Sequence, residues 1–306
     1  MYLSHFDLQE PPFGITPDTD YYLPRGSHRE ALNTLLVALR SGEGFVKLTA
    51  EVGLGKTVLL RKLLTELGEA FVTAYIPNPD ISPKAMQLAL ASELGLKVNE
   101  RMTRERLHRM LNTHLIEIAR DGKRAVLLID EAQALPPASL EFIRLLTNLE
   151  TEKFKLLQVV LAGQPELDRR LAQRRFRPLR QRIGFSARLE PMDRDMVEAY
   201  INHRLRVAGP GQPSLFASRA LDLIHGASAG VPRLVNILCH KALMVAWGQG
   251  LRRVDAQCVR LAIEDTENTR LPLVRRRWLA WRGEVAVVAL ALGASLGLAW
   301  MIGARL

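Results

Sequence analysis

The sequence predicts an α/β domain built on a parallel sheet with helices on both faces, then an all-helical domain and a C-terminal transmembrane helix. Three observations carry this prediction. Strand-like apolar runs alternate with helical patterns up to about residue 189, the strand signals stop from about Glu190, and residues 285–304 contain no charge. Alternating strands and helices are typical of parallel sheets, because each crossover helix packs back on the sheet.

The first 27 residues are predicted to be an extended, proline-rich lead-in. Their start lacks the charged and apolar regions of a signal peptide, and we expect their aromatic side chains to pack on a core. A helix at 28–40 follows, with Ser27 as its N-cap and Glu30 three residues later. The α/β domain is assigned to residues 28–189.

Within this domain the apolar patterns predict four strands and four further helices. The strands fall at 45–48, 71–76, 125–129 and 154–162, and the helices at 58–64, 83–94, 103–121 and 139–148. The second domain is assigned to residues 190–268, with helices at 193–207, 218–228, 232–247 and 255–265. Gly-rich and Pro-rich spacers at 209–213 and 229–232 separate these helices.

The stretch TAEVGLGKT lies between the first strand and the next helix, where a phosphate-binding loop has to lie. It differs from the usual G-x-x-x-x-G-K-[ST] pattern only in having Ala50 at the first glycine, which we expect to be tolerated unless a positive φ is needed there. Lys56 is predicted to reach the β and γ phosphates, and Thr57 to bind Mg²⁺. The predicted nucleotide-binding residues are Ala50, Glu51, Val52, Gly53, Leu54, Gly55, Lys56 and Thr57.

The buried run AVLLI at 125–129 ends in two acids, Asp130 and Glu131. This is the form of a strand that delivers carboxylates to a nucleotide. Asp130 is predicted to bind nucleotide and Mg²⁺, and Glu131 to polarise the attacking water. The two motifs together predict an ATP hydrolase with ATP and Mg²⁺ as cofactors.

Positive charge is concentrated in two places. The net charge is +10, yet eight arginines and no acid lie between 169 and 188, and five arginines and one glutamate between 270 and 284. Two local features of this kind do not demand a general nucleic-acid surface. The cysteines, Cys239 and Cys258, have no metal-type spacing and are expected to be buried thiols.

Residues 285–304 are twenty uncharged residues, which as a helix would span ~30 Å, the thickness of a bilayer's hydrocarbon layer. A basic juxtamembrane linker at 269–284 precedes them. This excess of arginine on the N-terminal side predicts a single-pass protein whose large domain stays in the cytoplasm. A buried core helix is the alternative.

Eight motifs then occur in order over residues 1–265: FDLQEPPFGITPD, TAEVGLGKT, LLIDEAQAL, LTNLET, LAGQPEL, LRQRI, YINHRL and GVPRLVN. In this order they resemble the ExeA/GspA group of AAA+ ATPases from bacterial secretion and pilus assembly. The resemblance implies a three-layer AAA+ P-loop domain with strand order 5-1-4-3-2, followed by a helical lid. It also implies a homo-oligomer working with inner-membrane pilus or secretion assembly proteins.

The resemblance assigns further site residues. Gln164 matches sensor 1, and Arg233 the sensor 2 arginine of the lid. Arg180 and Arg182 match the region of an arginine finger directed at the neighbouring subunit, and the choice between them stays open. With Glu131, these four make up the predicted catalytic set. Because ExeA carries a periplasmic peptidoglycan region with no counterpart in this sequence, we do not expect direct cell-wall binding.

The leading hypothesis from the sequence is a membrane-anchored ATPase that couples ATP binding and hydrolysis to assembly of a type IV pilus or type II secretion apparatus. The runner-up is a DNA-dependent ATPase of the transposition-helper kind, supported by the arginine run. The transmembrane prediction and the lack of a DNA-reading module disfavour nucleic acid as a partner. A third hypothesis is a nucleotide-gated scaffold that scarcely hydrolyses ATP.

Overall fold

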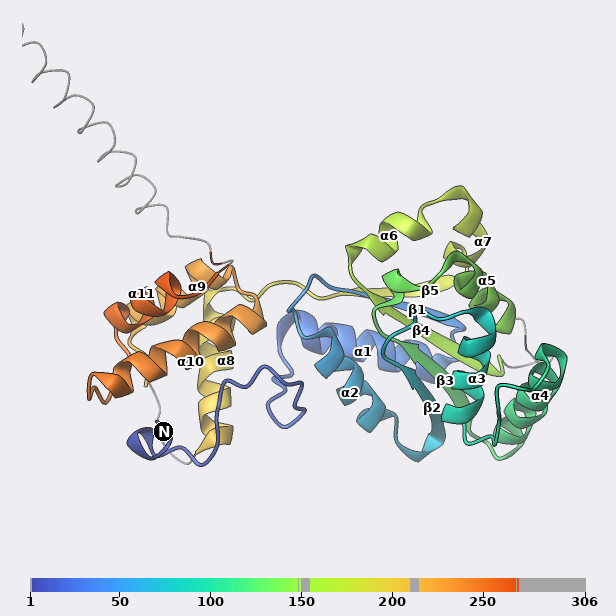
Figure 1. Ribbon diagram of the computed structural model, residues 1–306, viewed down its shortest axis with the longest axis horizontal. Helices are drawn as coiled ribbons and strands as arrows, with labels where there is room; N and C mark the ends of the chain where they lie inside the picture. The colour runs from blue at the N-terminus through green and yellow to red at the C-terminus, as the bar shows by residue number, and fades with distance from the viewer. Residues whose placement is uncertain (1, 148, 150–154, 210–214, 268, 270–306) are drawn as a thin grey trace, which may run out of the picture.

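A parallel sheet forms the larger body of the molecule, in a computed structural model that describes residues 2–147, 149, 155–209, 215–267 and 269 (Figure 1). Its strands are β1 (Phe45–Thr49), β2 (Phe71–Ile76), β3 (Arg124–Ile129), β4 (Leu157–Gly163) and β5 (Ile183–Arg188). They pair in the order β2-β3-β4-β1-β5, and every pairing is parallel. This is the strand order that the resemblance implies.

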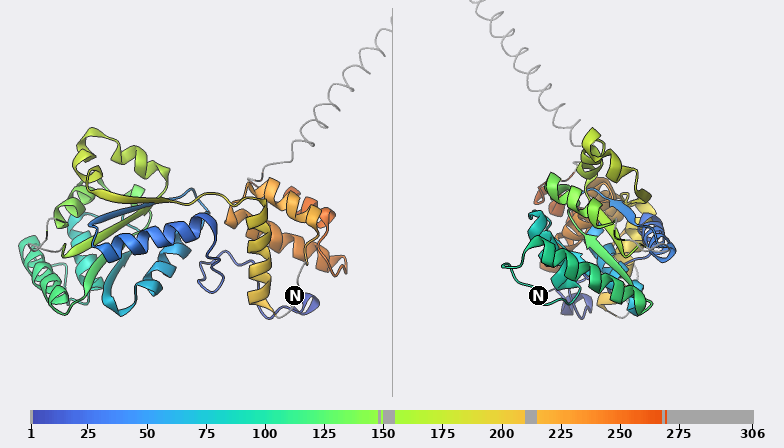
Figure 2. Two further views of the ribbon diagram at one scale, coloured as in Figure 1. Left: turned by 180° about the vertical axis from the view of Figure 1, so that it is seen from behind. Right: turned by 90° about the vertical axis from the view of Figure 1, so that its right-hand side faces the viewer.

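Helices cover both faces of the sheet (Figures 1 and 2). One face packs against α1 (Gly26–Ser41) and α2 (Lys56–Leu67). The other packs against α3 (Pro83–Glu93), α4 (Arg104–Arg120), α5 (Pro137–Leu146), α6 (Pro165–Leu171) and α7 (Arg177–Arg180). β3 and β4 are almost completely buried, as expected of strands covered on both sides. The predicted three-layer α/β domain is confirmed.

Short 3₁₀ helices complete this body at Gly68–Ala70, Ala132–Ala134 and Arg174–Phe176, and another lies at Ser4–Phe6. The predicted cap at Ser27 is wrong. α1 begins one residue before Ser27, so Arg25 is the N-cap, and the Ser27 hydroxyl instead lies 3.1 Å from the backbone nitrogen of Glu190. That contact ties the start of α1 to the segment that follows β5.

The second body is helical and lies beside the α/β body (Figure 1). It contains α8 (Arg194–Ala208), α9 (Ser218–Ser228), α10 (Pro232–Gly248) and α11 (Ala256–Glu264), each within two residues of its predicted bounds. Both cysteines are buried free thiols in this body. We refer to this body as the lid.

The N-terminal segment packs into the lid. The side chains of Tyr2, Phe6, Leu8, Phe13 and Tyr21 are buried in the lid core, whereas Tyr22 is buried in the core between α1, α2 and the sheet. The backbone nitrogen of Gln9 also donates to the carbonyl of Ala208 at the end of α8. The chain therefore passes from one body to the other between Tyr21 and Tyr22.

The predicted membrane-spanning segment, 285–304, and most of the basic linker lie outside the described residues. Among the helices of the described part, none combines the length and apolar character needed to cross a bilayer.

Candidate functional site

The loop after β1 has the backbone of a phosphate cradle. Gly53 and Gly55 have φ of +84° and +87°, in the left-handed region that favours glycine. A Cβ on Gly53 would lie 3.0 Å from Val231 and 3.1 Å from the Cβ of Arg233, so a side chain there would push the lid away. The loop opens directly into α2, whose positive N-terminus favours anions.

Ala50 fits where the usual pattern has glycine. Its φ is not positive, its side chain is buried, and its backbone nitrogen donates to the carbonyl of Gly163 at 3.0 Å. The methyl group therefore packs in the core between α1, α2 and the sheet without straining the loop.

Thr57 and Asp130 offer oxygen atoms suited to Mg²⁺. The Thr57 hydroxyl donates to Asp130 Oδ2 at 2.8 Å, and Tyr75 donates to the same oxygen at 3.4 Å. Burial, followed by the charge of Asp130, raises the pKa of Tyr75 to about 12, so its hydroxyl stays protonated. Protein Mg²⁺ sites commonly use one or two side-chain oxygens plus phosphates and water, so this pair fits. Among the described residues, no group of three or more acidic, histidine or cysteine side chains that could hold a metal ion is found.

The Glu131 carboxylate receives three donors. Lys56 Nζ lies 2.8 Å from Oε1, while the side-chain amides of Gln133 and Gln164 both donate to Oε2. Burial raises the pKa of Glu131, but these hydrogen bonds outweigh it and lower the pKa below its usual value. The group is therefore a carboxylate at neutral pH, as a base for water must be.

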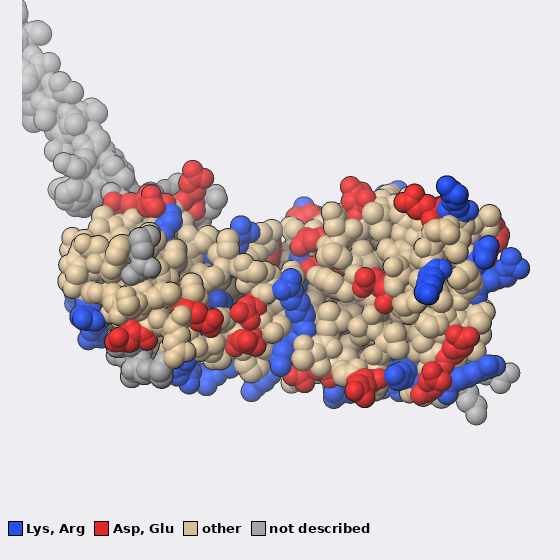
Figure 3. Space-filling view, turned by 60° about the horizontal axis from the view of Figure 1, so that its bottom comes forward, with Lys and Arg blue, Asp and Glu red and all other residues tan. Residues whose placement is uncertain are grey.

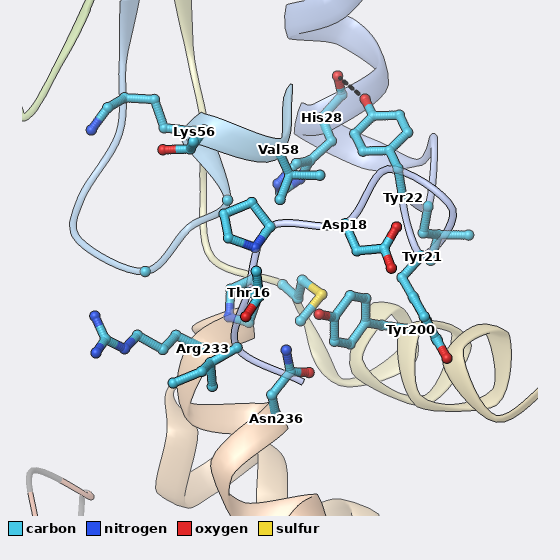
Figure 4. Close-up of a pocket in the computed structure, with 18 of the residues that line it drawn as sticks. Thr16, Asp18, Tyr21, Tyr22, His28, Lys56, Val58, Tyr200, Arg233 and Asn236 are labelled. Carbon is cyan, nitrogen blue, oxygen red and sulfur yellow. Dashed lines mark hydrogen bonds between the residues drawn. The ribbon is translucent and has the colours of Figure 1, made fainter. Parts of the chain in front are cut away.

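A cavity of about 380 Å³ extends from the phosphate loop between the two bodies (Figure 4). Its walls come from the N-terminal segment at 14–18, the loop at 51–58, the strand ends at Glu131 and Gln164, and the lid. The cavity thus extends from the predicted phosphate site to Thr16 in the N-terminal segment and Tyr200 on the lid (Figure 4).

The lid contributes residues from α8 and α10. Arg233 lies in the first turn of α10 with its side chain lining the cavity, and its backbone nitrogen donates to the carbonyl of Gly53 at 3.2 Å. Buried Arg204 and Asn236 both donate to the carbonyl of Gly14. The lid therefore contacts both the phosphate loop and the N-terminal wall of the same cavity.

Arg180 and Arg182 lie away from this cavity. Both are exposed near α7, beside α5, and Arg182 donates to the carbonyl of Arg144 and the hydroxyl of Thr147. Neither lines the cavity of its own chain. Glu131, Gln164 and Arg233 are thus brought together with the phosphate loop, whereas the two finger candidates are not.

Sequence reasoning missed several residues of the site. Gln133 and Tyr75 contact the predicted acids, and His28 Nε2 lies 2.8 Å from the carbonyl of Leu54 in the phosphate loop. For Gln133, its position two residues after Glu131 was a signal in the sequence that it belongs to the site. Contacts of Tyr75 and His28 depend on strand and helix neighbours that are distant in sequence.

Known proteins share sequence with much of this chain. Residues 39–171 match the family model of an AAA domain. General secretion pathway protein A of Aeromonas hydrophila is 42% identical over 270 residues, which cover 88% of this chain and 49% of that protein. The chain therefore spans about half the length of this relative.

Solved structures share the fold. The ORC2 protein of Aeropyrum pernix gives a TM-score of 0.63 at 16% identity, covering 87% of this chain and 74% of that chain. CDC6P from Pyrobaculum aerophilum gives 0.62 at 23% identity, covering 82% and 69%. The matched model, the strand order and the phosphate-loop geometry show that residues 39–171 hold an AAA domain with a phosphate loop, in a chain similar to general secretion pathway protein A.

Proposed function

We propose that this chain is a membrane-anchored ATPase that couples ATP binding and hydrolysis to assembly of a secretion apparatus or a type IV pilus. The observation that carries the proposal is the 42% identity to general secretion pathway protein A across 88% of the chain. The opening MYLSHF also resembles MshM, a member of the same group from the mannose-sensitive haemagglutinin pilus system, which favours a pilus as the structure assembled.

The site supports a direct path for hydrolysis. Glu131 accepts a proton from water as the water oxygen bonds to the γ-phosphorus, and the bond from that phosphorus to the β–γ bridging oxygen breaks. The products are ADP, which keeps the bridging oxygen, and inorganic phosphate. Lys56 binds the phosphate oxygens, and Gln164 contacts the γ-phosphate or the water. Bound Mg²⁺, held by Thr57 and Asp130, would neutralise phosphate charge.

Hydrolysis would change the position of the lid relative to the sheet. Arg233 lines the cavity beside the phosphate loop, and an arginine fork is suited to phosphate charge. Loss of the γ-phosphate removes a partner of that arginine. Since Arg204 and Asn236 tie the N-terminal segment to the lid, the two would move together relative to the sheet.

A homo-oligomer completes the proposed site. Arg180 and Arg182 lie on the outside of the α/β body, so they would act on the ATP of a neighbouring copy. An arginine supplied in this way stabilises transition-state charge.

Anchoring rests on the sequence of the C-terminal segment. The uncharged run at 285–304 is long enough to cross a bilayer, and four arginines at 275, 276, 277 and 282 precede it. We place the ATPase domain on the cytoplasmic side of a bacterial inner membrane, where it would meet inner-membrane assembly proteins.

A DNA-dependent ATPase is the second candidate. Its support is the exposed arginines at 174, 175, 177 and 180, for which no ion pair with a described acidic residue is found. Another relative, an uncharacterised HTH-type transcriptional regulator of Methanocaldococcus jannaschii, is 26% identical over 242 residues, 76% of this chain and 58% of that protein. On the face drawn in Figure 3, however, basic and acidic side chains are interspersed, which disfavours a broad DNA-binding surface.

Complementation in the native bacterium separates the two functions. A deletion strain would receive wild-type protein, the Glu131→Gln variant, or the Lys62→Ala control, whose lysine is on α2 but pairs with Glu66 outside the site. We expect wild type and Lys62→Ala to restore surface pilin or secreted protein, and Glu131→Gln to fail. Normal pili and secretion in the deletion strain, with duplex DNA stimulating hydrolysis by purified protein, would overturn the proposal in favour of the DNA function.

A further inference from the structure

Gln133 contacts both Glu131 and Gln164, the two residues proposed to act on the attacking water and the γ-phosphate. Its Oε1 accepts from the backbone nitrogen of Gln164 at 3.0 Å, and its Nε2 donates to Glu131 Oε2. A backbone N–H can only donate, so the orientation of the Gln133 amide is fixed by chemistry. We propose that Gln133 is a positioning residue for ATP hydrolysis, and that Arg170 holds Gln133 in place; this inference rests on the hydrolysis proposed at Glu131.

The hydrogen bonds decide which oxygen of Glu131 is available to water. Oε2 is occupied by the amides of Gln133 and Gln164, and Oε1 faces Lys56. When Lys56 binds phosphate, Oε1 is the oxygen left to accept a proton. Two amides on the other oxygen prevent rotation of the carboxylate, and such alignment is what general-base catalysis requires.

The backbone of Glu131 needs this support. Its φ is +49° and its ψ +37°, a left-handed conformation that is uncommon outside glycine and that persists when surrounding contacts impose it. The turn at Ala132–Ala134 follows immediately, and Gln133 lies within it. The same short turn therefore sets both the backbone of Glu131 and the side chain that orients its carboxylate.

Gly163 has no side chain, and this leaves space for the side chain of Gln133. A Cβ on Gly163 would lie 2.8 Å from Gln133 Oε1 and 3.1 Å from Leu167. Gly163 ends β4, the strand beside β3, so the glycine and the glutamine meet only through sheet pairing. A side chain at 163 would displace the Gln133 amide from Glu131 and Gln164.

Arg170 also holds this turn in place, through hydrogen bonds to its backbone. Its guanidinium, on α6, donates to the backbone carbonyls of Gln133 and Leu135. Its neighbour Arg169 has a side chain 76% exposed and pairs with Glu166 on its own helix. Both residues belong to the arginine run. Arg170 nevertheless binds the turn beside Glu131 in its own chain, whereas Arg169 faces solvent.

Steady-state hydrolysis and ATP binding by the full-length protein test the proposal. Gln133→Leu keeps the size of the side chain but removes the amide, and we expect kcat to fall about tenfold or more while the Kd for ATP changes less than twofold. Arg170→Ala should lower kcat in the same manner, Arg170→Lys should recover part of it, and Arg169→Ala should match wild type.

A double-mutant cycle keeps the test decisive if one variant is poorly folded. Gly163→Ala should lower kcat in the presence of Gln133, and should add little further loss in Gln133→Ala, because the displaced group is already gone. Thermal melting identifies any variant that loses activity because it unfolds. If Gln133→Leu or an Arg170 variant does so, the cycle carries the test in its place.

Three outcomes would overturn the inference: kcat within twofold of wild type for Gln133→Leu, equal losses for Arg169→Ala and Arg170→Ala, or additive losses in the cycle. Failure of the underlying assignment is distinguishable. In that case Glu131→Gln would hydrolyse ATP as fast as wild type, whereas failure of this inference alone leaves Glu131→Gln inactive.

Discussion

Lys56 Nζ lies 2.8 Å from Glu131 Oε1, although the two residues are 75 positions apart in sequence. The side chain that meets phosphate and the side chain that meets water thus lie against each other at the end of the sheet. Their tasks can still be separated, because binding requires the ammonium and turnover requires the carboxylate.

We expect Lys56→Ala to abolish ATP binding, and Glu131→Gln to bind ATP but hydrolyse it at least ~100-fold more slowly, the scale of general-base catalysis. A fluorescent ATP analogue measures binding, and phosphate release measures turnover. Lys62→Ala, on the same helix, is the control. Equal hydrolysis by wild type and Glu131→Gln would contradict the assignment of the base.

Ala50→Gly restores the usual loop pattern, and we expect no gain in nucleotide affinity. Ala50 is buried and has no positive φ, so glycine offers the loop nothing that it lacks. Glycine makes the unfolded chain more flexible, and we expect a loss of ~0.4–1 kcal/mol in the free energy of unfolding. Urea denaturation and ATP titration check both points. A tenfold tighter Kd would show that alanine impairs the site.

Because of His28, the free energy of unfolding should fall in mild acid. Burial lowers the pKa of His28, with the hydrogen bond to the carbonyl of Leu54 opposing this in part. Because the folded pKa is below the unfolded value of about 6.5, the stabilisation is complete above that pH and is lost as pH falls below it.

Denaturation at pH 8 and pH 5 tests this expectation. His203 and His240 have pKa values lowered in the same direction, so the difference between wild type and His28→Gln isolates one group. His28→Gln should lose less stability than wild type between the two pH values. An equal or larger loss would contradict the prediction.

The segment at 285–304 should hold the protein in the membrane. Full-length protein is expected in the carbonate-washed membrane pellet, and truncation after Arg270 should release an active ATPase into the supernatant, because no uncharged span remains. Immunoblots of the two fractions measure this. Recovery of the full-length protein in the supernatant would favour the alternative of a buried core helix.

Arg180 or Arg182 should act on the neighbouring subunit. We expect Arg180→Ala/Arg182→Ala protein to bind ATP normally but to lose turnover by ~10³-fold or more, as when an arginine finger is removed. Arg177→Ala, exposed on the same short helix, is the matched control.

Mixing two inactive proteins decides this point. The arginine double variant supplies a competent pocket, and Lys56→Ala protein supplies competent arginines. Partial recovery of phosphate release on mixing is the expected result. No recovery, together with salt-sensitive binding of duplex DNA by wild type, would assign the arginines to nucleic acid instead.

The sequence by itself determined the features that depend on local spacing. The TAEVGLGKT pattern between a strand and a helix predicts a phosphate-binding loop, and an apolar run ending in Asp130 predicts a buried strand that delivers a carboxylate. The backbone conformation of such motifs depends on neighbouring residues, so their pattern can be recognised without the fold. Resemblance to known ATPases added Gln164 and Arg233, and the structure places both at the cavity.

Only the tertiary structure decided which distant residues meet. Nothing in the local pattern distinguished Arg170 from Arg169, yet one binds the turn beside Glu131 and the other faces solvent. β5 lies inside the arginine run at the edge of the sheet, and its exposed positions are Gly184, Ser186 and Arg188, so it has no continuous apolar run that would mark a strand. Likewise, the N-terminal aromatics pack in the lid because α8 and α10 are brought to them by the fold, which no spacing along the chain records.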